Sequence, residues 1–329
     1  MVKPVNPSRR AFLQIAASTA ALPAGTLSAL ALDYPTRPVK IIVPVPPGGA
    51  LDINARLIGQ WLSERLGQSF VVENRPGAST NVGVEAATRA SPDGYTLLLV
   101  PGSVATNATL YPNLPFNVIR DIVPIGMISR LPLVMDVNLS VPAKTVSEFI
   151  AYAKANPGKL SFASSGNGSP QHIAAEFFKM KTGVDMVHVP YHGGAPALTD
   201  LMAGQIQLYF SPLPESVAVI KAGKVRALAV TTATRVDAFP DIPTVGESVP
   251  GFEASTWQGI GAPTGTPAEI VTKLNGEINA ALADPGIKEK LANLGSLPSP
   301  MSPGDFKAFI VAETAKWAGV IKAANIKAE

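Results

Sequence analysis

The chain has 329 residues, of which 47% are hydrophobic, and it contains no cysteine. Lys3, Arg9 and Arg10 are the charged residues among the first 31, and removing them from the 27 basic residues leaves 24, equal to the 24 acidic residues. This balance argues against the basic surface that nucleic-acid phosphates require, so we expect no nucleic-acid partner. Without cysteine the fold depends on its core, and this length favours two lobes.

Residues 1–31 have the composition of an export signal. Arg9-Arg10 precede an apolar, alanine-rich stretch over 15–30, which closes in a small-x-small pattern ending at Ala31. Polar residues, proline and glycine interrupt the stretch, so it is too polar for a membrane anchor. We therefore expect a twin-arginine-type signal cleaved after Ala31 and a periplasmic mature protein.

The pattern from residue 39 onward predicts a strand, a tight turn and a helix. An apolar run over 39–45 leads into Pro46-Pro47-Gly48-Gly49, and apolar residues at helical spacing follow. Glycine lets the backbone approach a bound group, and the first helical turn has unpaired N–H groups that attract anions. We predict ligand contacts there, and Asp52 is more typical of a residue that complements the helix dipole than of a general base. The candidates are Pro47, Gly48, Gly49 and Asp52.

Two further strands, over 70–73 and 95–100, are each followed by a polar turn. The first turn precedes a helix over 82–90, which Ser79, Thr80 or Asn81 is suited to cap, and the second covers 101–107. Strands that alternate with helices predict a parallel sheet with its ligand at the carboxyl ends of the strands. The candidates from these turns are Thr80, Asn81 and Ser103.

A second α/β segment follows a predicted crossing over 122–137. After a helix over 146–154 and a strand over 160–163, a turn of small polar residues leads into a helix over 173–180. This turn again places hydroxyls and free amides at a helix start. Its candidate ligand contacts are Ser164, Ser165, Gly166, Asn167, Ser169 and His172.

A second Gly-Gly pair lies between a strand over 187–190 and a helix over 197–203. The candidates in this turn are Tyr191, expected to wall the cleft, and His192, Gly193 and Gly194. Later strands are predicted over 206–210, 225–232 and 257–263, and helices over 267–283, 285–294 and 303–325. Because the strand near Trp257 returns the chain, we expect lobe one at 33–133 plus 255–329 and lobe two at 134–254.

Six motifs occur in an order that resembles a known family. They are Pro46-Pro47-Gly48-Gly49-x-x-Asp52, Asn74-Arg75-Pro76-Gly77-Ala78, Asp93-Gly94-Tyr95-Thr96-Leu97, Val189-Pro190-Tyr191-x-Gly193-Gly194, Phe239-Pro240-Asp241-Ile242-Pro243-Thr244-Val245-Gly246-Glu247 and Ala262-Pro263-x-Gly265-Thr266-Pro267. Together they resemble the substrate-binding receptors of tripartite tricarboxylate transporters, the Bug-type family, over essentially the whole mature chain. The resemblance implies a two-lobed α/β fold of type II periplasmic-binding-protein topology with a ligand cleft between the lobes.

The resemblance also implies a function. A receptor of this family captures a small carboxylate, holds it by backbone amides, hydroxyls and bridging waters, and delivers it to the membrane components of a tripartite tricarboxylate-type transporter. We expect a monomer without cofactor. The family commonly has lysine or arginine where this sequence has His192, so a permanent cation is replaced by a pH-dependent one. If His192 points inward, affinity for a dicarboxylate should weaken as pH rises from about 5.5 to 8.

Neutral groups are then expected to hold most of the acid, through the amides of the two Gly-Gly turns and nearby hydroxyls. The hydroxyls are those of Thr80, Ser103, Ser164, Ser165 and Ser169.

The alternative function is a periplasmic hydrolase that uses Ser165 or Ser169 with His172, His188 or His192. A nucleophile elbow requires Gly-x-Ser-x-Gly, whereas here the glycines lie between the two serines. No cysteine or acidic cluster at metal-ligand spacing accompanies the histidines, so we expect no metal. A third class, a scaffold without a small ligand, is distinguished by the absence of any thermal shift with solutes.

Overall fold

The computed structural model describes residues 1–2, 33–237 and 239–328. Apart from its first two residues, the expected export signal at residues 1–31 lies outside the described residues. Contacts divide the chain into Met1–Asp33 and Tyr34–Glu329. All the described helices and strands belong to Tyr34–Glu329.

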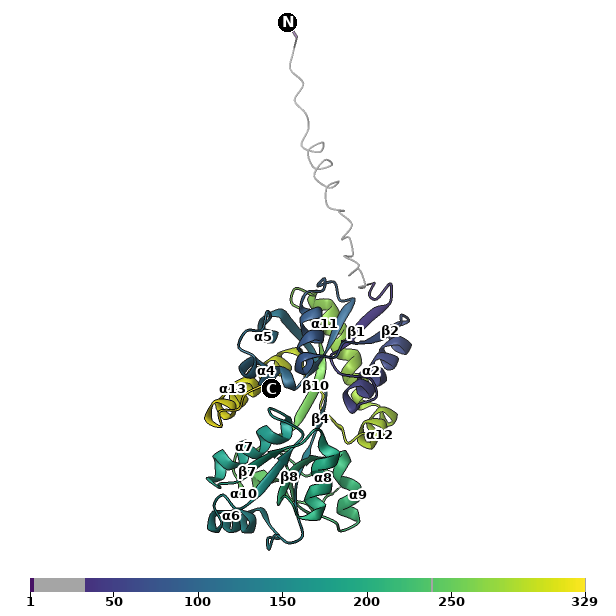
Figure 1. Cartoon of the computed structure of the whole chain (residues 1–329). Helices are drawn as coiled ribbons and strands as arrows, with labels where there is room; N and C mark the ends of the chain where they lie inside the picture. The colour runs from purple at the N-terminus through teal and green to yellow at the C-terminus, as the bar shows by residue number, and fades with distance from the viewer. Residues whose placement is uncertain (3–32, 238, 329) are drawn as a thin grey trace. The chain divides into compact units, whose positions relative to one another are not determined.

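Six strands form the first sheet of the described chain, in the order β11-β4-β10-β3-β1-β2 (Figure 1). Their bounds are β1 Val39–Val43, β2 Phe70–Asn74, β3 Thr96–Pro101, β4 Ile122–Leu131, β10 Thr256–Pro263 and β11 Leu297–Pro298. β1 runs parallel to β2 and β3, but β10 runs antiparallel to β3 and β4. The parallel arrangement predicted for the three strands that alternate with helices is confirmed, and the sheet becomes mixed only where β4 carries the chain out and β10 returns it in the opposite direction.

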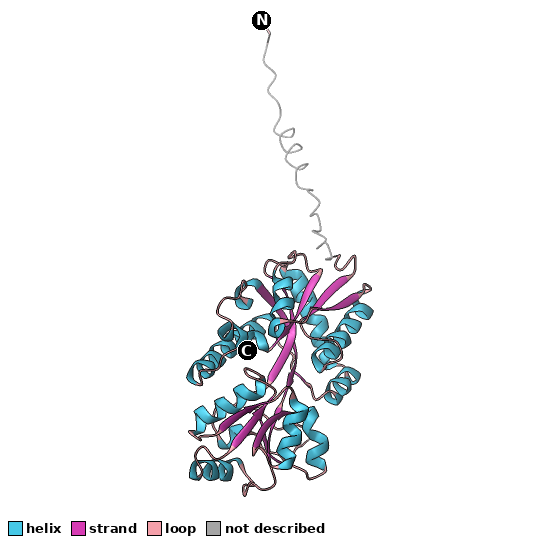
Figure 2. Ribbon diagram, in the orientation of Figure 1, coloured by secondary structure: helices cyan, strands magenta, loops and turns pink. Residues whose placement is uncertain are grey.

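Helices cover the strands of this first lobe on both sides (Figure 2). Their bounds are α2 Ala50–Leu66, η1 Ala78–Thr80, α3 Asn81–Thr88, α4 Ser103–Leu110, α5 Val118–Asp121, α11 Ala268–Ala283, α12 Pro285–Asn293 and α13 Pro303–Ala323. The predicted polar turn over 101–107 is wrong, since α4 begins at Ser103. Val104 and Ala105 are buried and α4 packs on α13, so tertiary contacts stabilise a helix that its polar sequence does not indicate.

Five strands form the second sheet of the described residues, in the order β7-β6-β8-β5-β9. The strands are β5 Leu133–Val137, β6 Ser161–Ser164, β7 Val187–Pro190, β8 Leu208–Pro212 and β9 Arg226–Val230, and the helices are α6 Val146–Ala155, α7 Pro170–Thr182, α8 Gly194–Ala203, α9 Leu213–Lys221 and α10 Val245–Ser248. β6 runs parallel to β7 and β8, whereas β5 runs antiparallel to β8 and β9. This sheet is therefore also mixed, because β5, which receives the chain from lobe one, runs opposite to its two neighbours.

Side-chain alternation along the strands of lobe two gives each face of its sheet a separate core. Phe162 and Phe210 belong to the same buried cluster as Phe178 of α7. Ala163 and Tyr209, one position away on the same strands, pack instead with Leu201 of α8. Successive strand residues point to opposite faces, so α7 and α8 cover opposite sides of the sheet.

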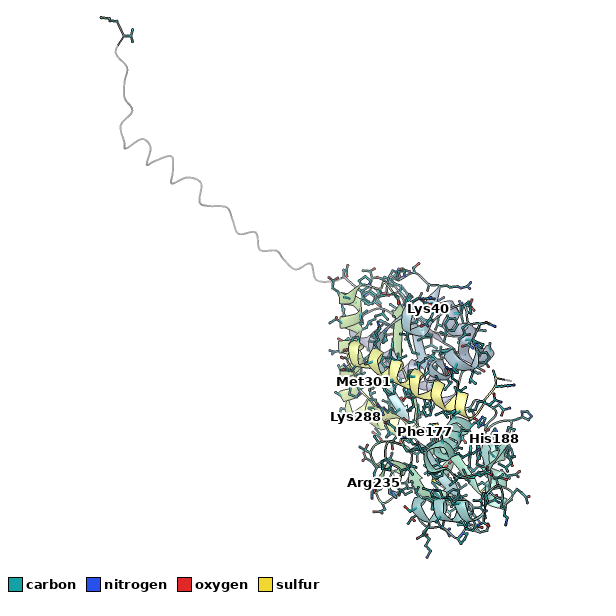
Figure 3. The ribbon with its side chains drawn as sticks, turned by 90° about the vertical axis from the view of Figure 1, so that its left-hand side faces the viewer. Lys40, Phe177, His188, Arg235, Lys288 and Met301 are labelled. Carbon is teal, nitrogen blue, oxygen red and sulfur yellow. The ribbon has the colours of Figure 1, made fainter. Side chains whose placement is uncertain are left out.

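The two lobes are joined by β4, which passes through Pro132 into β5, and by the chain that returns into β10 (Figure 1). Arg130 of β4 forms an ion pair with Glu253 just before β10, and its guanidinium lies 4.9 Å from the ring centroid of Phe309 in α13. The far end of α13 reaches lobe two near Phe177 of α7 (Figure 3). Trp317 of α13 packs edge-on against Phe177 at 5.6 Å. The prediction of a two-lobed α/β fold is confirmed.

Candidate functional site

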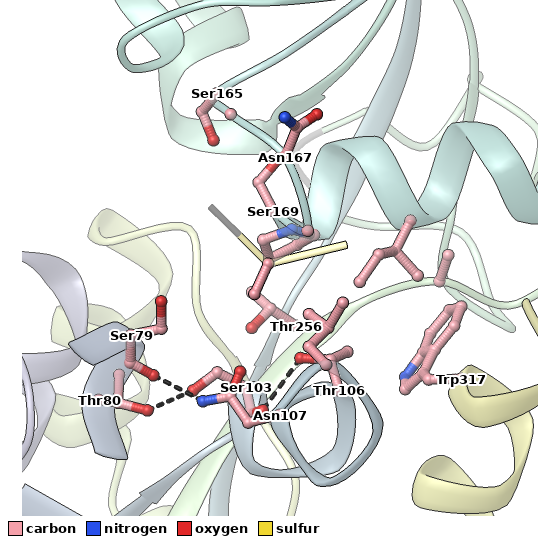
Figure 4. Close-up of a pocket in the computed structure, with 18 of the residues that line it drawn as sticks. Ser79, Thr80, Ser103, Thr106, Asn107, Ser165, Asn167, Ser169, Thr256 and Trp317 are labelled. Atoms are coloured by element: carbon pink, nitrogen blue, oxygen red, sulfur yellow. Dashed lines mark hydrogen bonds between the residues drawn. The ribbon is translucent and has the colours of Figure 1, made fainter. Parts of the chain in front are cut away.

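A cavity of about 340 Å³ is bounded by segments of both lobes (Figure 4). Lobe one contributes the turn at Ser79 and one face of α4, and lobe two contributes the loop before α7. Within the described residues, no Asp, Glu, Lys, Arg or His side chain lines the cavity. The lining residues are Ser79, Thr80, Gly102, Ser103, Thr106, Asn107, Leu110, Tyr111, Leu133, Ser165, Gly166, Asn167, Gly168, Ser169, Pro170, Ile173, Ala254, Ser255, Thr256, Trp257, Trp317 and Ala328.

The lobe-one wall is built on a strained backbone turn. Ala78, Ser79 and Thr80 have φ angles of 43°, 53° and 80°, in the left-handed region that costs an L-residue roughly 1–2 kcal/mol. Asn107 of α4 is buried, and its Nδ2 donates to the Ser79 carbonyl at 2.6 Å and to Asn81 Oδ1 at 3.0 Å. The amide of Asn107 therefore holds the turn in place, and strain retained in this way is common at binding sites.

Two hydroxyl pairs also join this turn to α4 and to Tyr111, which directly follows α4. The hydroxyls of Thr80 and Ser103 are 2.8 Å apart, as are those of Ser79 and Tyr111. Each pair has two protons and uses one of them in its own hydrogen bond. Lobe one therefore presents two neutral donors to the cavity.

The lobe-two wall is the loop between β6 and α7. Gly166 and Gly168 have φ angles of 129° and 73°, which favour glycine, and Ser164 Oγ donates to the Gly166 carbonyl at 3.0 Å. Ser165 Oγ donates to Gln171 Oε1 at 2.9 Å, so its proton is already used. Ser169 is the N-cap of α7 and accepts a backbone N–H there, which leaves its hydroxyl proton available to a ligand.

Two stacked histidines support this loop from behind. The rings of His172 and His188 lie 3.7 Å apart, and the Ser164 hydroxyl lies 2.6 Å from His188 Nε2. The pKa of His172 is lowered to about 3, chiefly by burial and further by the nearby His188 and Lys179. The His172 ring is therefore neutral at neutral pH, and its Nδ1 accepts the Gly168 N–H at 3.1 Å.

Aromatic and aliphatic side chains complete the lining. Trp257 enters from β10 and packs edge-on against Phe306 at 5.8 Å. Trp317 Nε1 donates to Glu313 Oε2 at 2.9 Å, which fixes the indole beside the cavity. Leu110 and Ile173 add apolar surface from lobes one and two. The cavity therefore combines neutral donors with apolar walls, a combination typical of small-ligand sites.

The structure brings six of the predicted ligand-binding residues together on this cavity: Thr80, Ser103, Ser165, Gly166, Asn167 and Ser169. Ser164 and His172 do not line it, but they hold the loop that does. Asn81 lines a neighbouring cavity. Thr80 occupies the N-cap position of α3 and makes no side-chain capping bond, so the predicted capping role is wrong for this residue.

The first Gly-Gly turn lies away from the cavity lining, and the predicted residues there are Pro47, Gly48, Gly49 and Asp52. Asp52 is buried and accepts from the Gly48 N–H at 2.9 Å, from Arg56 Nε at 3.0 Å and from Asn74 Nδ2 at 2.8 Å. Burial opposes ionisation, but these hydrogen bonds hold the pKa of Asp52 below its usual range. Asp52 thus fixes the turn and places the protein's own anion at the start of α2.

The second Gly-Gly turn also lies away from this lining, with its predicted residues Tyr191, His192, Gly193 and Gly194. Tyr191 Oη donates to Asp200 Oδ2 at 2.7 Å, and His192 is exposed. A Cβ added to Gly194 would lie 2.2 Å from Glu215 Oε2, so a carboxyl lies beside the start of α8. Burial raises the pKa of Glu215.

Sequence reasoning missed several lining residues, chiefly Ser79, Thr106, Asn107, Tyr111 and Trp317. Asn107 and Tyr111 follow Ser103 at intervals of four residues, which places them on one face of a helix. This four-residue spacing can be recognised only once residues 103–110 are known to form a helix. Trp317 lies far along the chain, and α13 alone brings it to the cavity.

The geometry gives the two candidate nucleophiles structural roles. Ser165 donates to an amide oxygen and Ser169 caps a helix. Among the described residues, no group of three or more His, Cys, Asp or Glu side chains is placed to hold a metal ion. Within the same described part of the chain, no helix has the length and apolar character needed to cross a bilayer.

Two α/β lobes around a cavity of neutral donors define the class of solute-binding receptors. Residues 54–326 match the tripartite tricarboxylate transporter family receptor, and the chain belongs to that family. Receptors of this family are periplasmic and bind solutes without catalysis. The prediction of the family and of a receptor function is confirmed.

Three known proteins illustrate the similarity. The protein BugT of Bordetella pertussis is 37% identical over 92% of this chain and 94% of its own. A structure from R. palustris with adipate is 40% identical, with a TM-score of 0.74 over 89% of this chain and 99% of that one. MatC from Rhodopseudomonas palustris with bound malate is 31% identical, with a TM-score of 0.70 over 88% of this chain and 100% of that one.

Proposed function

We propose that this receptor binds a small linear dicarboxylic acid in the 340 Å³ cavity and releases it unchanged. The observation that carries the proposal is the arrangement of the donors. The hydroxyl pairs of lobe one lie on one wall and the Ser169 hydroxyl on the other, with apolar side chains beside them. Related receptors hold adipate and malate, which supports this ligand class.

Neutral groups are sufficient for such a ligand. A hydrogen bond to a charged group contributes roughly 1.5–3 kcal/mol, and several such bonds offset the desolvation of a carboxylate without a fixed cation. We propose that the two Gly-Gly turns also contact the acid once the lobes close. Gly48, Gly49 and Gly193 face open space, where an added Cβ would meet no atom within 4 Å. We propose that hinge closure brings these turns, with the neighbouring predicted residues, toward the acid.

The proposal extends to lobe boundaries, delivery and export. Lobe one comprises residues 33–133 plus 255–329, and lobe two the residues between, so closure bends the chain at two crossings. The closed monomer then docks on the membrane components of a tripartite tricarboxylate-type transporter. Mass spectrometry of the exported protein tests cleavage after Ala31. Light scattering tests whether the protein is a monomer. A pull-down with the transporter subunits at saturating acid tests the docking.

The test of the function is a thermal-shift screen of C4 to C10 dicarboxylic acids, followed by calorimetric titration. A bound acid should raise the melting temperature by mass action. Mass spectrometry of the same samples, and of samples incubated with the corresponding amides and esters, should recover each compound intact. No shift with any acid, or turnover that Ser165→Ala abolishes, would contradict the proposal.

Ser169→Ala tests the donor assignment, and Ser302→Ala is its matched control. Both serines are N-caps that accept a backbone N–H, but only Ser169 lines the cavity. Each substitution should destabilise the protein by about 1 kcal/mol. Only Ser169→Ala should weaken acid binding, by roughly ten- to a hundredfold. Equal affinities in the two variants would place the acid elsewhere.

A further inference from the structure

A second cavity, of about 430 Å³, adjoins the first within lobe one. It lies between the chain that follows α4 and the helix α13, and its lining includes Ala108, Phe116, Ile310 and Thr314. Arg120 also lines it, but the guanidinium is already paired with Asp121 at 2.5 and 2.8 Å. The second cavity is therefore spacious and has no strong anchor of its own for an anion.

Asn107 and Tyr111 line both cavities, so their side chains lie between the two spaces. They are four residues apart, at the end of α4, and so lie on one side of the helix. Both are hydrogen-bonded to Ser79: Asn107 to its carbonyl at 2.6 Å and Tyr111 to its hydroxyl at 2.8 Å. We call these two side chains the partition.

The two members of the partition are held differently. Asn107 is buried, and both protons of its amide are used in hydrogen bonds. Tyr111 is half-buried, and its hydroxyl makes one exposed hydrogen bond. Asn107 is thus a fixed part of the wall, while the ring of Tyr111 is the part that a substitution can remove without breaking the turn.

We propose that the ring of Tyr111 sets the longest dicarboxylic acid that the receptor accepts. This inference rests on the proposed function. With the ring in place, an acid anchored by the hydroxyls at the first cavity has to end at the partition. Without the ring, the two cavities join, and a longer acid extends its methylene chain over Phe116 and Ile310.

The experiment is a calorimetric titration of linear α,ω-dicarboxylates from C4 to C10 against the wild type and Tyr111→Ala. In wild type, affinity should fall beyond the length that fills the first cavity. In Tyr111→Ala, affinity for the longer acids should rise relative to the C4 acid by about fourfold for each methylene that enters the second cavity. An unchanged chain-length profile would overturn the inference.

Two controls separate the ring from its hydrogen bond. Tyr111→Phe keeps the ring and loses the bond to Ser79, so it should keep the wild-type profile with weaker binding throughout. Thr314→Phe, added to Tyr111→Ala, refills the second cavity from α13 and should remove the gain for long acids. A profile in Tyr111→Phe that shifts as far as in Tyr111→Ala would overturn the inference.

Folding and function are checked separately. If Tyr111→Ala does not fold, Tyr111→Leu also removes the ring and should give the same shift in smaller measure, and an unshifted profile in Tyr111→Leu would overturn the inference. Wild-type protein that bound none of the acids would contradict the proposed function and this inference with it. Wild-type binding with identical profiles in every variant would contradict the inference alone.

Discussion

Asp136 lies on β5 with no exposed surface, and its surroundings do not compensate its charge. Ser211 and Ser216 donate to its Oδ2 at 2.5 and 2.6 Å, while Oδ1 has no hydrogen-bond partner among the described residues. Burial outweighs these two bonds and raises the pKa of Asp136 to about 6, against an ordinary value of 3.8. Ionised Asp136 therefore destabilises the folded state.

We expect Asp136→Asn to stabilise the protein at pH 7.5 by as much as about 3 kcal/mol, because the amide needs no ionisation. Because the pKa of Asp136 is higher in the folded than in the unfolded protein, its protonated form stabilises the folded state at pH values below the unfolded-state pKa. This contribution to stability is lost as pH rises through the folded-state pKa. The difference between variant and wild type should therefore shrink as pH falls from about 6 to 4. Urea unfolding at several pH values measures it, and a difference independent of pH would contradict the assignment.

At the scale of elements, the turn at Ala78–Thr80 and helix α4 depend on each other. Asn107 holds the three left-handed residues of the turn through the Ser79 carbonyl, and the hydroxyls of Ser103 and Tyr111 add hydrogen bonds to the turn's side chains. The helix in turn presents those side chains only because it packs on α13. The donors of lobe one are therefore positioned before a ligand arrives, which reduces the entropy lost on binding.

Ala78→Gly tests the strain, with Ala108→Gly as the same chemical change in the regular helix α4. Glycine at residue 78 removes the penalty of the left-handed backbone and should stabilise the protein by up to about 1 kcal/mol. Glycine at residue 108 should destabilise it by about 1 kcal/mol. Guanidinium unfolding measures both changes, and equal losses would show that the turn is unstrained.

At the scale of the whole receptor, α13 links the lobes on the side of the cavity. Trp317 belongs to α13, lines the cavity, and packs on Phe177 of α7, which in turn stacks on Phe252 at 5.0 Å. Any hinge motion that moves the lobes changes the surroundings of this indole. Trp317 is therefore a natural reporter of closure.

We expect a saturating acid to change the intrinsic fluorescence of the wild type, and Trp317→Phe to reduce that change, with the remainder coming from Trp257, which also lines the cavity. Trp61→Phe is the control, since Trp61 lies on α2 and does not line the cavity. Stopped-flow titration measures the signal beside calorimetric affinities. A ligand-dependent signal that survives Trp317→Phe and disappears with Trp61→Phe would contradict this view of closure.

The sequence alone determined the family, the fold class and most of the element order. Hydrophobic periodicity and glycine turns are local, so β1, α2 and the elements around Gly166 and Gly193 could be predicted to within a few residues. The six ordered motifs identified the receptor family. Six of the candidate ligand contacts lie together on one cavity, and their role in binding remains a prediction.

Tertiary structure decided the rest, because a cavity forms between segments that are far apart in the chain. Local sequence gives no sign that β10 runs against β3, that α4 is a helix, or that Trp317 reaches the site. Asp52 and Glu215 lie at the helix starts where an outside anion was expected, and only packing shows this. Periodicity reports which face of an element is buried, whereas the partner across that face depends on the folded chain as a whole.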